Sequence, residues 1–138
     1  MSAQPGAGSG PLVIEARRAY SPAMAEDPVQ SNPGNYRVVL ENDRVRVLEY
    51  TDEPGHTSVE HHHPDSVMIT ASSFRRRLHA RGASIEVDLP DGAVRWLPAQ
   101  DHHGENIGDT PTHAFFIELK ETGPQAEETI DQLGPSAP

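Results

Sequence analysis

The chain lacks cysteine and is poor in basic residues. Without a thiol it can form no disulfide, so any metal site must use histidine, aspartate, glutamate or amide groups. The 11 lysines and arginines are outnumbered by 21 aspartates and glutamates, giving a formal net charge of −10. This acidic balance disfavours binding to nucleic acids and to anionic membrane surfaces, because both need a cationic protein face. We interpret the one basic cluster, Arg75–Arg77 with Arg81, as a solvated face rather than an anion-binding patch.

Aromatic residues and long apolar runs are also scarce. Phe, Trp and Tyr make up 5% of the 138 residues, and the hydrophobic residues together make up 35%. No stretch has the apolar length of a signal peptide or a membrane span, so we expect a cytoplasmic protein. The chain length suits a single domain with one modest core.

The two ends of the chain differ in composition from its middle. Residues 1–33 are rich in Gly, Ala, Ser and Pro, and residues 122–138 are rich in Pro, Gly and acidic side chains. We therefore predict a flexible N-terminal arm (1–33), a β-barrel domain (34–121) and a C-terminal tail (122–138). Short helical turns are expected at most in PLVIEARRAYSPAMAED (11–27), which Pro22 interrupts, and in AEETIDQL (126–133).

Short apolar runs alternate with turn residues through the middle of the chain. The segment YRVVLENDRVRVLEY (36–50) predicts two strands joined by a turn at Asn42-Asp43. Further β-rich runs follow at 58–63, 66–72, 74–80, 84–89, 93–98 and 113–121. Six to nine short strands at this spacing predict an all-β sandwich or a barrel of antiparallel strands.

Three of the eight histidines stand together as His61-His62-His63. If this run is a strand, His61 and His63 share one face, with their Cα atoms about 6.6 Å apart, and His62 takes the other face. Two imidazoles at that spacing can converge on one ion at about 2.0–2.1 Å from each nitrogen. His61 and His63 are therefore candidate metal ligands.

A second histidine pair occurs at His102-His103. In an extended strand, His102 shares a face with Gln100, and His103 shares the opposite face with Asp101. A barrel can bring distant strands together, so His102 can complete a three-histidine set with the earlier pair, and Gln100 is a candidate fourth ligand or hydrogen-bond donor to a substrate. The other histidines lack such spacing and are expected to be surface or hydrogen-bonded residues: His56, His79 and His113.

Two segments resemble the two sequence motifs of the cupin superfamily: PGHTSVEHHHPDSVMIT (54–70) and LPDGAVRWLPAQDHHGENIGDTPTHAFFIELKE (89–121). The resemblance covers about residues 28–121 and is to the small single-domain cupins of the BauB-like, β-alanine degradation type. It implies an all-β double-stranded β-helix, a jelly-roll barrel, with flexible N- and C-terminal extensions. Hydrophobic positions expected to be distributed between the two sheets are Val45, Val47, Ile69, Ile85, Val87, Trp96, Phe115 and Ile117.

The first cupin motif has a glycine, five residues, a His-any-His pair and a carboxylate three or four positions later. Gly55, His61 and His63 match it, and the resemblance implies that both histidines bind metal. Ser66 and Val67 stand where the carboxylate is expected, and the aspartate just before them is a weak substitute.

The second motif has a glycine, a proline, a histidine and an asparagine. Gly92, Pro98, His102 and Asn106 match it, although Gln100 replaces a usual glycine and the interval from proline to histidine is one residue short. This match favours His102 over its histidine neighbour as the third ligand.

Three neutral imidazoles without a carboxylate suit a divalent transition metal such as Fe, Ni, Cu or Zn better than Mg or Ca. Such a site is compatible with a dioxygenase, lyase or isomerase acting on a small oxygen-rich molecule. Two alternatives stay open: a non-enzymatic ligand-binding or sensing barrel with weakened or lost metal binding, and a barrel whose histidines only hydrogen-bond to one another. The resemblance also implies a homodimer formed through sheet edges.

Overall fold

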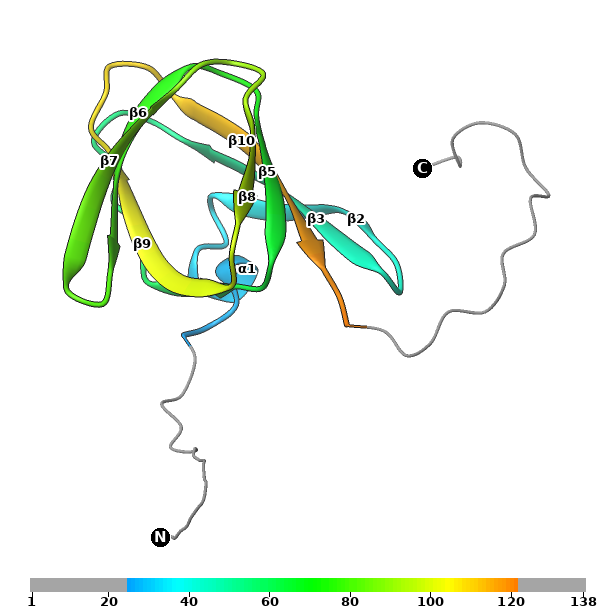
Figure 1. Cartoon of the computed structure of the whole chain (residues 1–138). Coiled ribbons are helices and arrows are strands. Elements are labelled where there is room, and N and C mark those ends of the chain that lie inside the picture. Colours follow the sequence, from blue (N-terminus) through cyan, green and yellow to red (C-terminus); the bar gives the residue numbers. More distant parts are fainter. Residues whose placement is uncertain (1–24, 122–138) are drawn as a thin grey trace, which may run out of the picture.

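The computed structural model describes residues 25–121, which form a barrel of two antiparallel β-sheets with one short helix at its end (Figure 1). The elements in chain order are α1 (Pro28–Ser31), β2 (Tyr36–Glu41), β3 (Val45–Asp52), β4 (His61–His63), β5 (Ser66–Thr70), β6 (Phe74–Ala80), β7 (Ala83–Leu89), β8 (Val94–Leu97), β9 (Gln100–Asn106) and β10 (Thr112–Leu119). No helix among these residues has the length and apolarity needed to cross a membrane.

The two sheets are connected by a chain that crosses repeatedly between them. One sheet has the strand order β2-β3-β10-β5-β8, and the other has the order β4-β9-β6-β7. From β4 onward the chain passes to the five-stranded sheet at β5, back at β6, across again at β8, back at β9 and across at β10. This alternation is the double-stranded β-helix expected from the sequence, and the prediction of an all-β jelly-roll barrel is confirmed.

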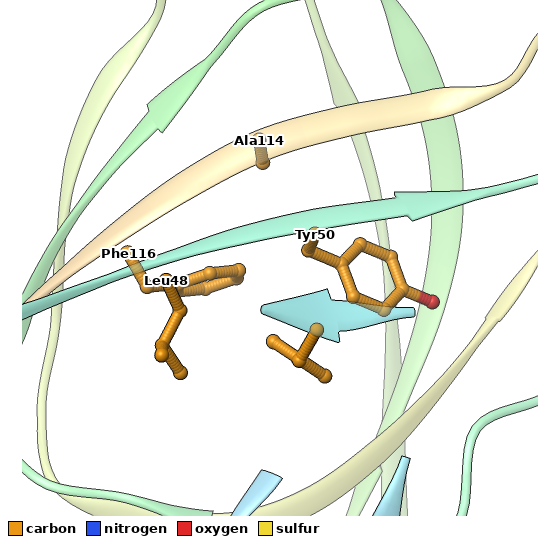
Figure 2. Close-up of a cluster of buried hydrophobic side chains, with 5 residues drawn as sticks. Leu48, Tyr50, Ala114 and Phe116 are labelled. Atoms are coloured by element: carbon orange, nitrogen blue, oxygen red, sulfur yellow. The ribbon is translucent and has the colours of Figure 1, made fainter. Parts of the chain in front are cut away.

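The apolar core lies on the inner face of the five-stranded sheet, where β3 pairs with β10. Leu48 stands opposite Phe116, and Tyr50 stands opposite Ala114; all four are buried (Figure 2). Tyr36, at the start of β2, pairs with Tyr50 and completes the cluster. The first strand of the sequence-predicted hairpin thus contributes its aromatic residue directly to the core.

The hydrophobic positions expected from the sequence lie mostly outside this core. Ile85 and Trp96 are 60% and 55% exposed. The others are half-buried: Val45, Val47, Ile69, Val87, Phe115 and Ile117. Both β3 and β10 carry apolar residues at successive positions, so a shift of one residue exchanges the inner and outer faces, and the pattern alone does not decide between them.

The glycines that open the two histidine-containing motifs both adopt a left-handed backbone. Gly55 has φ 90° before β4, and Gly92 has φ 83° before β8. A side chain at either position would be strained, because residues with a Cβ rarely adopt positive φ. Each motif therefore begins with a tight turn that delivers the chain to the strand that follows.

Residues 25–33, assigned to the flexible arm from the sequence, contact the barrel. The side chain of Asp27 caps α1 by accepting from the backbone N–H of Val29 (3.0 Å), and it pairs with Arg46 of β3 (2.5 Å). The carboxylate of Asp27 thus ties the segment to the barrel, well before residue 34. The proposed division into arm, barrel and tail otherwise stays a prediction. The helical turn expected within 126–133 lies outside the described residues, as do residues 11–24 of the turn expected within 11–27, whose last three residues are not helical.

Candidate metal centre

Three histidines converge at one end of the barrel interior. His61 and His63 come from the two ends of β4, and His102 comes from β9, directly opposite His61 in the strand pairing. All three are buried, with exposures of 2%, 0% and 6%, and a potential ligand atom from each lies within 4.8 Å of the others. The structure therefore brings together the three residues that the sequence proposed, and this group could hold a metal ion.

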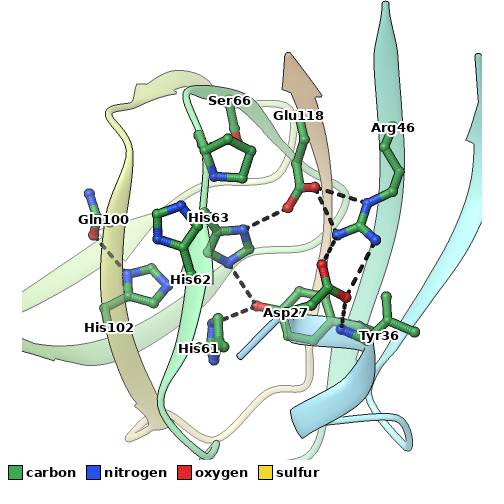
Figure 3. Close-up of polar contacts among 12 residues, drawn as sticks. Asp27, Tyr36, Arg46, His61, His62, His63, Ser66, Gln100, His102 and Glu118 are labelled. Carbon is green, nitrogen blue, oxygen red and sulfur yellow. Dashed lines mark hydrogen bonds and ion pairs between the residues drawn. The ribbon is translucent and has the colours of Figure 1, made fainter. Parts of the chain in front are cut away.

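The outer ring nitrogens of His61 and His102 are bonded to protein oxygens. His61 Nδ1 lies 2.7 Å from the carbonyl oxygen of Val59. Figure 3 shows the corresponding contact of His102, whose Nδ1 lies 2.7 Å from Oε1 of Gln100. Both oxygens can only accept, so in a neutral ring Nδ1 carries the proton and Nε2 keeps its lone pair. Gln100 thus contacts the far side of His102, and its amide nitrogen donates to the carbonyl oxygen of Pro98.

His63 is held in the same way by a carboxylate that sequence reasoning missed. Its Nδ1 donates to Oε2 of Glu118 (3.1 Å), a buried residue on β10. Glu118 in turn pairs with Arg46 (2.9 Å), which also contacts Asp27, so a chain of charges leads from His63 to the N-terminal segment (Figure 3). The ring of His63 stacks on Phe116, with centroids 4.8 Å apart. Its orientation is therefore fixed by a hydrogen bond and by packing.

The hydroxyl of Tyr36 lies between two of the converging rings. It is 3.2 Å from Nε2 of His61 and 3.3 Å from Nε2 of His63. Because a hydroxyl has one proton, it can donate to only one of these nitrogens at a time. Burial raises the pKa of Tyr36 well above its usual value, so this hydroxyl is protonated at neutral pH. In the sequence, this role of Tyr36 is signalled only by an aromatic residue at the start of a strand.

Burial also sets the protonation of the three histidines. It lowers the pKa of His63 and of His102 to about 3 in each case, with neighbouring histidines adding to the effect. The pKa of His61 is also lowered, again mainly by burial. The rings are therefore neutral at pH 7, which is the form that binds metal ions. Burial raises the pKa of Glu118, and the nearby Arg46 opposes this effect.

The neighbouring histidines face away from the centre, as strand alternation requires. His62 bonds through Nδ1 to Asp101 (2.7 Å), and His103 stacks on His79, with ring centroids 4.7 Å apart. His79 and His113 have carboxylate partners, as expected for hydrogen-bonded surface residues. His56 differs, because its Nε2 is buried and has no hydrogen-bond partner among the described residues.

The position where the first motif lacks its carboxylate is closed off from the centre. Ser66 is buried, and its hydroxyl donates to the carbonyl oxygen of Pro64 (2.7 Å). Asp65 is exposed and accepts from the backbone N–H of Ala99 (2.9 Å). Neither side chain takes the place of the missing carboxylate.

A cavity of about 280 Å³ extends from the histidines between the two sheets. His61 and His102 form part of its wall, which is otherwise mostly apolar and includes Met68, Phe74 and Trp96. A small molecule in this cavity would therefore touch the histidine group on one side and hydrocarbon on the others.

No family model and no curated protein matches the sequence significantly. Among solved structures, a cupin domain from Bordetella pertussis is 27% identical over 62% of this chain and 92% of that one, with a TM-score of 0.59. An RmlC-like cupin family protein from Methanocaldococcus jannaschii is 12% identical over 61% and 77% of the two chains, with a TM-score of 0.51. A Klebsiella pneumoniae protein with a double-stranded β-helix domain is 20% identical over 78% and 83%, with a TM-score of 0.50. The chain therefore has the double-stranded β-helix fold of cupin proteins.

Proposed function

We propose that this protein is a metal-binding cupin in which His61, His63 and His102 hold one divalent transition metal ion through Nε2. The observation that carries the proposal is the set of outer hydrogen bonds, because all three Nδ1 atoms donate to protein oxygens and leave the three Nε2 lone pairs for a ligand. Outer partners of this kind fix the tautomer and the ring orientation of metal-binding histidines.

The donor set selects the kind of metal. Three neutral imidazoles favour Fe, Ni, Cu or Zn over Mg and Ca, which prefer oxygen ligands. Two nitrogens bound to one ion at 2.0–2.1 Å are at most about 4.2 Å apart, so the three rings must draw slightly together from their present spacing of up to 4.8 Å. The hydroxyl of Tyr36 must then give up both of its contacts with Nε2, because the ion takes the lone pair of each nitrogen.

The substrate is proposed to be a small oxygen-rich molecule that enters the cavity, and the reaction class is that of a dioxygenase, lyase or isomerase. A bound transition metal would supply a Lewis acid with open coordination positions. The chain itself excludes bulk water with its apolar cavity wall, and it offers the Tyr36 hydroxyl as a hydrogen-bonding group beside the histidines.

A second candidate function is non-enzymatic binding or sensing of a small ligand. It is favoured by the absence of an obvious general base among residues 25–121, since Ser66 is bonded to Pro64 and the carboxylate of Glu118 is engaged by His63 and Arg46. Turnover by the metal-loaded protein would favour the enzymatic function, whereas tight ligand binding without turnover would favour this second one.

Metal analysis of protein purified without a histidine tag tests the proposal. We expect close to one equivalent of a transition metal, lost in His61→Ala and His102→Ala but kept in His79→Ala, whose histidine stacks on His103 outside the group. Less than about a tenth of an equivalent, with no recovery on adding Fe(II), Ni(II), Cu(II) or Zn(II), would refute it. An equal loss in all three variants would refute the assignment of ligands.

We also propose that the protein is a homodimer that pairs through the free edge of β2. Val38, Val39 and Leu40 on this edge strand are 40–49% exposed. Pairing of this edge with the same edge of a second copy would cover these apolar side chains. Light scattering should give twice the chain mass for the native protein and the monomer mass for Val39→Lys; a monomeric native protein would refute this proposal.

A further inference from the structure

A buried arginine lies in the wall of the same cavity. Arg76 of β6 is 8% exposed and shares this wall with His61 and His102 and with apolar side chains such as Phe74 and Leu78. The sequence had suggested a solvated basic face for this arginine run, and Arg76 is the exception because it alternates inward with Phe74. A guanidinium beside an apolar cavity is costly to bury unless it is paired.

The partners of Arg76 are concentrated on one side of its guanidinium. Nη1 donates to Oδ2 of Asp52 (2.5 Å) and to the hydroxyl of Thr112 (3.1 Å). Within the described part of the chain, Nη2 has only a long contact, 3.4 Å, to the hydroxyl of Tyr50. One side of the guanidinium is thus anchored, and the other has hydrogen-bonding capacity to spare.

Asp52 has two hydrogen-bond donors besides Arg76. Its carboxylate also accepts from the Tyr50 hydroxyl (2.5 Å) and from the amide of Asn106 (3.0 Å). Two neutral donors thus join Arg76 on this carboxylate and hold the ion pair in one position. The guanidinium is thereby held rigidly, with Nη2 left to bind a second acceptor.

Gly104 packs directly against the weakly bonded nitrogen. It lies on β9, two residues after His102, so the two share a face and their Cα atoms are about 6.6 Å apart. A Cβ at Gly104 would lie 2.8 Å from Nη2 of Arg76 and 3.1 Å from Cδ2 of Leu78. The glycine does not have positive φ, so its missing side chain matters here because it lets Nη2 lie against the backbone of β9.

We propose that the cavity binds a small organic acid, with its carboxylate on Nη2 of Arg76 and its apolar body between the two sheets. At about 30 Å³ for each water-sized group, a cavity of about 280 Å³ holds a ligand of about nine or ten non-hydrogen atoms. This assignment adds a substrate class to the function proposed above, and it rests on that proposal only for the end of the ligand that reaches the histidines.

Phenylacetate and phenylacetamide are matched probes, because they have the same number of non-hydrogen atoms and differ in charge. Calorimetric titration of metal-loaded and metal-free protein should show phenylacetate binding at least tenfold more tightly than the amide. Arg76→Lys keeps a cation for Asp52 but removes the forked guanidinium, and Gly104→Ala keeps the Arg76 side chain but displaces its guanidinium. Each variant should lose at least tenfold in phenylacetate affinity.

Arg77→Lys is the matched control, because Arg77 points to the outer face and pairs with Glu86 and Glu105. It should bind phenylacetate as the native protein does. Thermal unfolding of every variant shows whether the fold is kept, and if Arg76→Lys does not fold, Gly104→Ala still tests the proposal.

Equal affinity for the acid and the amide, or no measurable binding of phenylacetate, would overturn the inference. The inference would also be overturned if phenylacetate affinity depended on metal and were unchanged in folded Arg76→Lys and Gly104→Ala. The carboxylate would then bind the metal and not Arg76. Metal content measured on the same samples separates the two proposals. Full metal content without discrimination refutes only the organic-acid site, and charge discrimination in a protein that binds no metal refutes only the metal site.

Discussion

Replacing Glu118 with glutamine would remove one negative charge from behind His63 and change the shape of the side chain very little. The carboxylate of Glu118 accepts from Nδ1 of His63 (3.1 Å) and pairs with Arg46 (2.9 Å). Glutamine has one oxygen for these two donors, and its amide nitrogen must then face either the imidazole N–H or the guanidinium. One of the two contacts is lost whichever way the amide turns.

Two magnitudes follow from these contacts. Loss of an outer partner of a metal-binding histidine typically weakens metal binding by 10–100-fold, or about 1.4–2.8 kcal/mol. The cost to folding should be about 1–3 kcal/mol, the range for a buried donor left without an acceptor. The cost to folding should stay below that of a fully unpaired buried charge, since Arg46 keeps its contact with Asp27 (2.5 Å).

The assay is a competition titration of Zn(II) against a chromophoric chelator at pH 7.5, with urea unfolding measured on the metal-free protein. Glu41→Gln is the control, because the exposed Glu41 carboxylate pairs with Lys120 and not with a candidate ligand. We expect weaker zinc binding only in Glu118→Gln. A zinc affinity within twofold of the native value, in a variant that is measurably less stable, would show that Glu118 does not orient His63.

Three further predictions concern stability. Leu48→Ala should lower the free energy of unfolding by about 3 kcal/mol, because Leu48 is fully buried. Leu40→Ala, on the exposed edge strand, should lower it by less than about 1 kcal/mol. Similar losses for the two variants in urea unfolding would contradict this assignment of the core. The metal-free protein should lose stability as the pH falls from about 6.5 toward about 3. In this range the unfolded chain binds protons on its histidines, whereas His63 and His102 have pKa values of about 3 in the folded protein and stay neutral. His102→Gln should flatten this dependence, and an unchanged slope in urea titrations at several pH values would contradict the cause given. Asp27→Ala should lower the free energy of unfolding, measured by thermal unfolding, by about 1–2 kcal/mol, because the helix cap and the ion pair with Arg46 are lost. No change would mean that these contacts of the N-terminal segment add nothing to stability.

The fold and the three converging histidines were within reach of the sequence because each depends on local spacing. Alternation along a strand places His61 and His63 together, and the second motif singles out His102. The left-handed Gly55 and Gly92 explain in physical terms why each motif begins with glycine. These features need only the conformation of a few consecutive residues.

The groups around the histidines were not predictable in the same way, because they come from distant strands. Glu118 is 55 residues from His63 in the chain, and Tyr36 is 25 residues from His61. A signal for Glu118 did exist, since it alternates inward with Ala114 and Phe116 in an apolar strand, but it could be used only once the inner face was known. Choosing that face needs the strand pairing, which the sequence alone does not provide.

The outer edge of β4, the shortest strand of the barrel, is covered by the segment that precedes the barrel. The N–H of His62 in β4 donates to the carbonyl oxygen of Glu26 (2.9 Å), and the N–H of Ala25 donates to Asp101, the partner of His62 (3.0 Å). A protein that began at residue 34 would keep every candidate ligand, yet it would leave the edge of β4 open to pairing with other chains. The segment before the barrel thus covers the edge of a strand that carries two candidate ligands. A proteolytic cut within this segment would promote aggregation and disturb the geometry of the histidines.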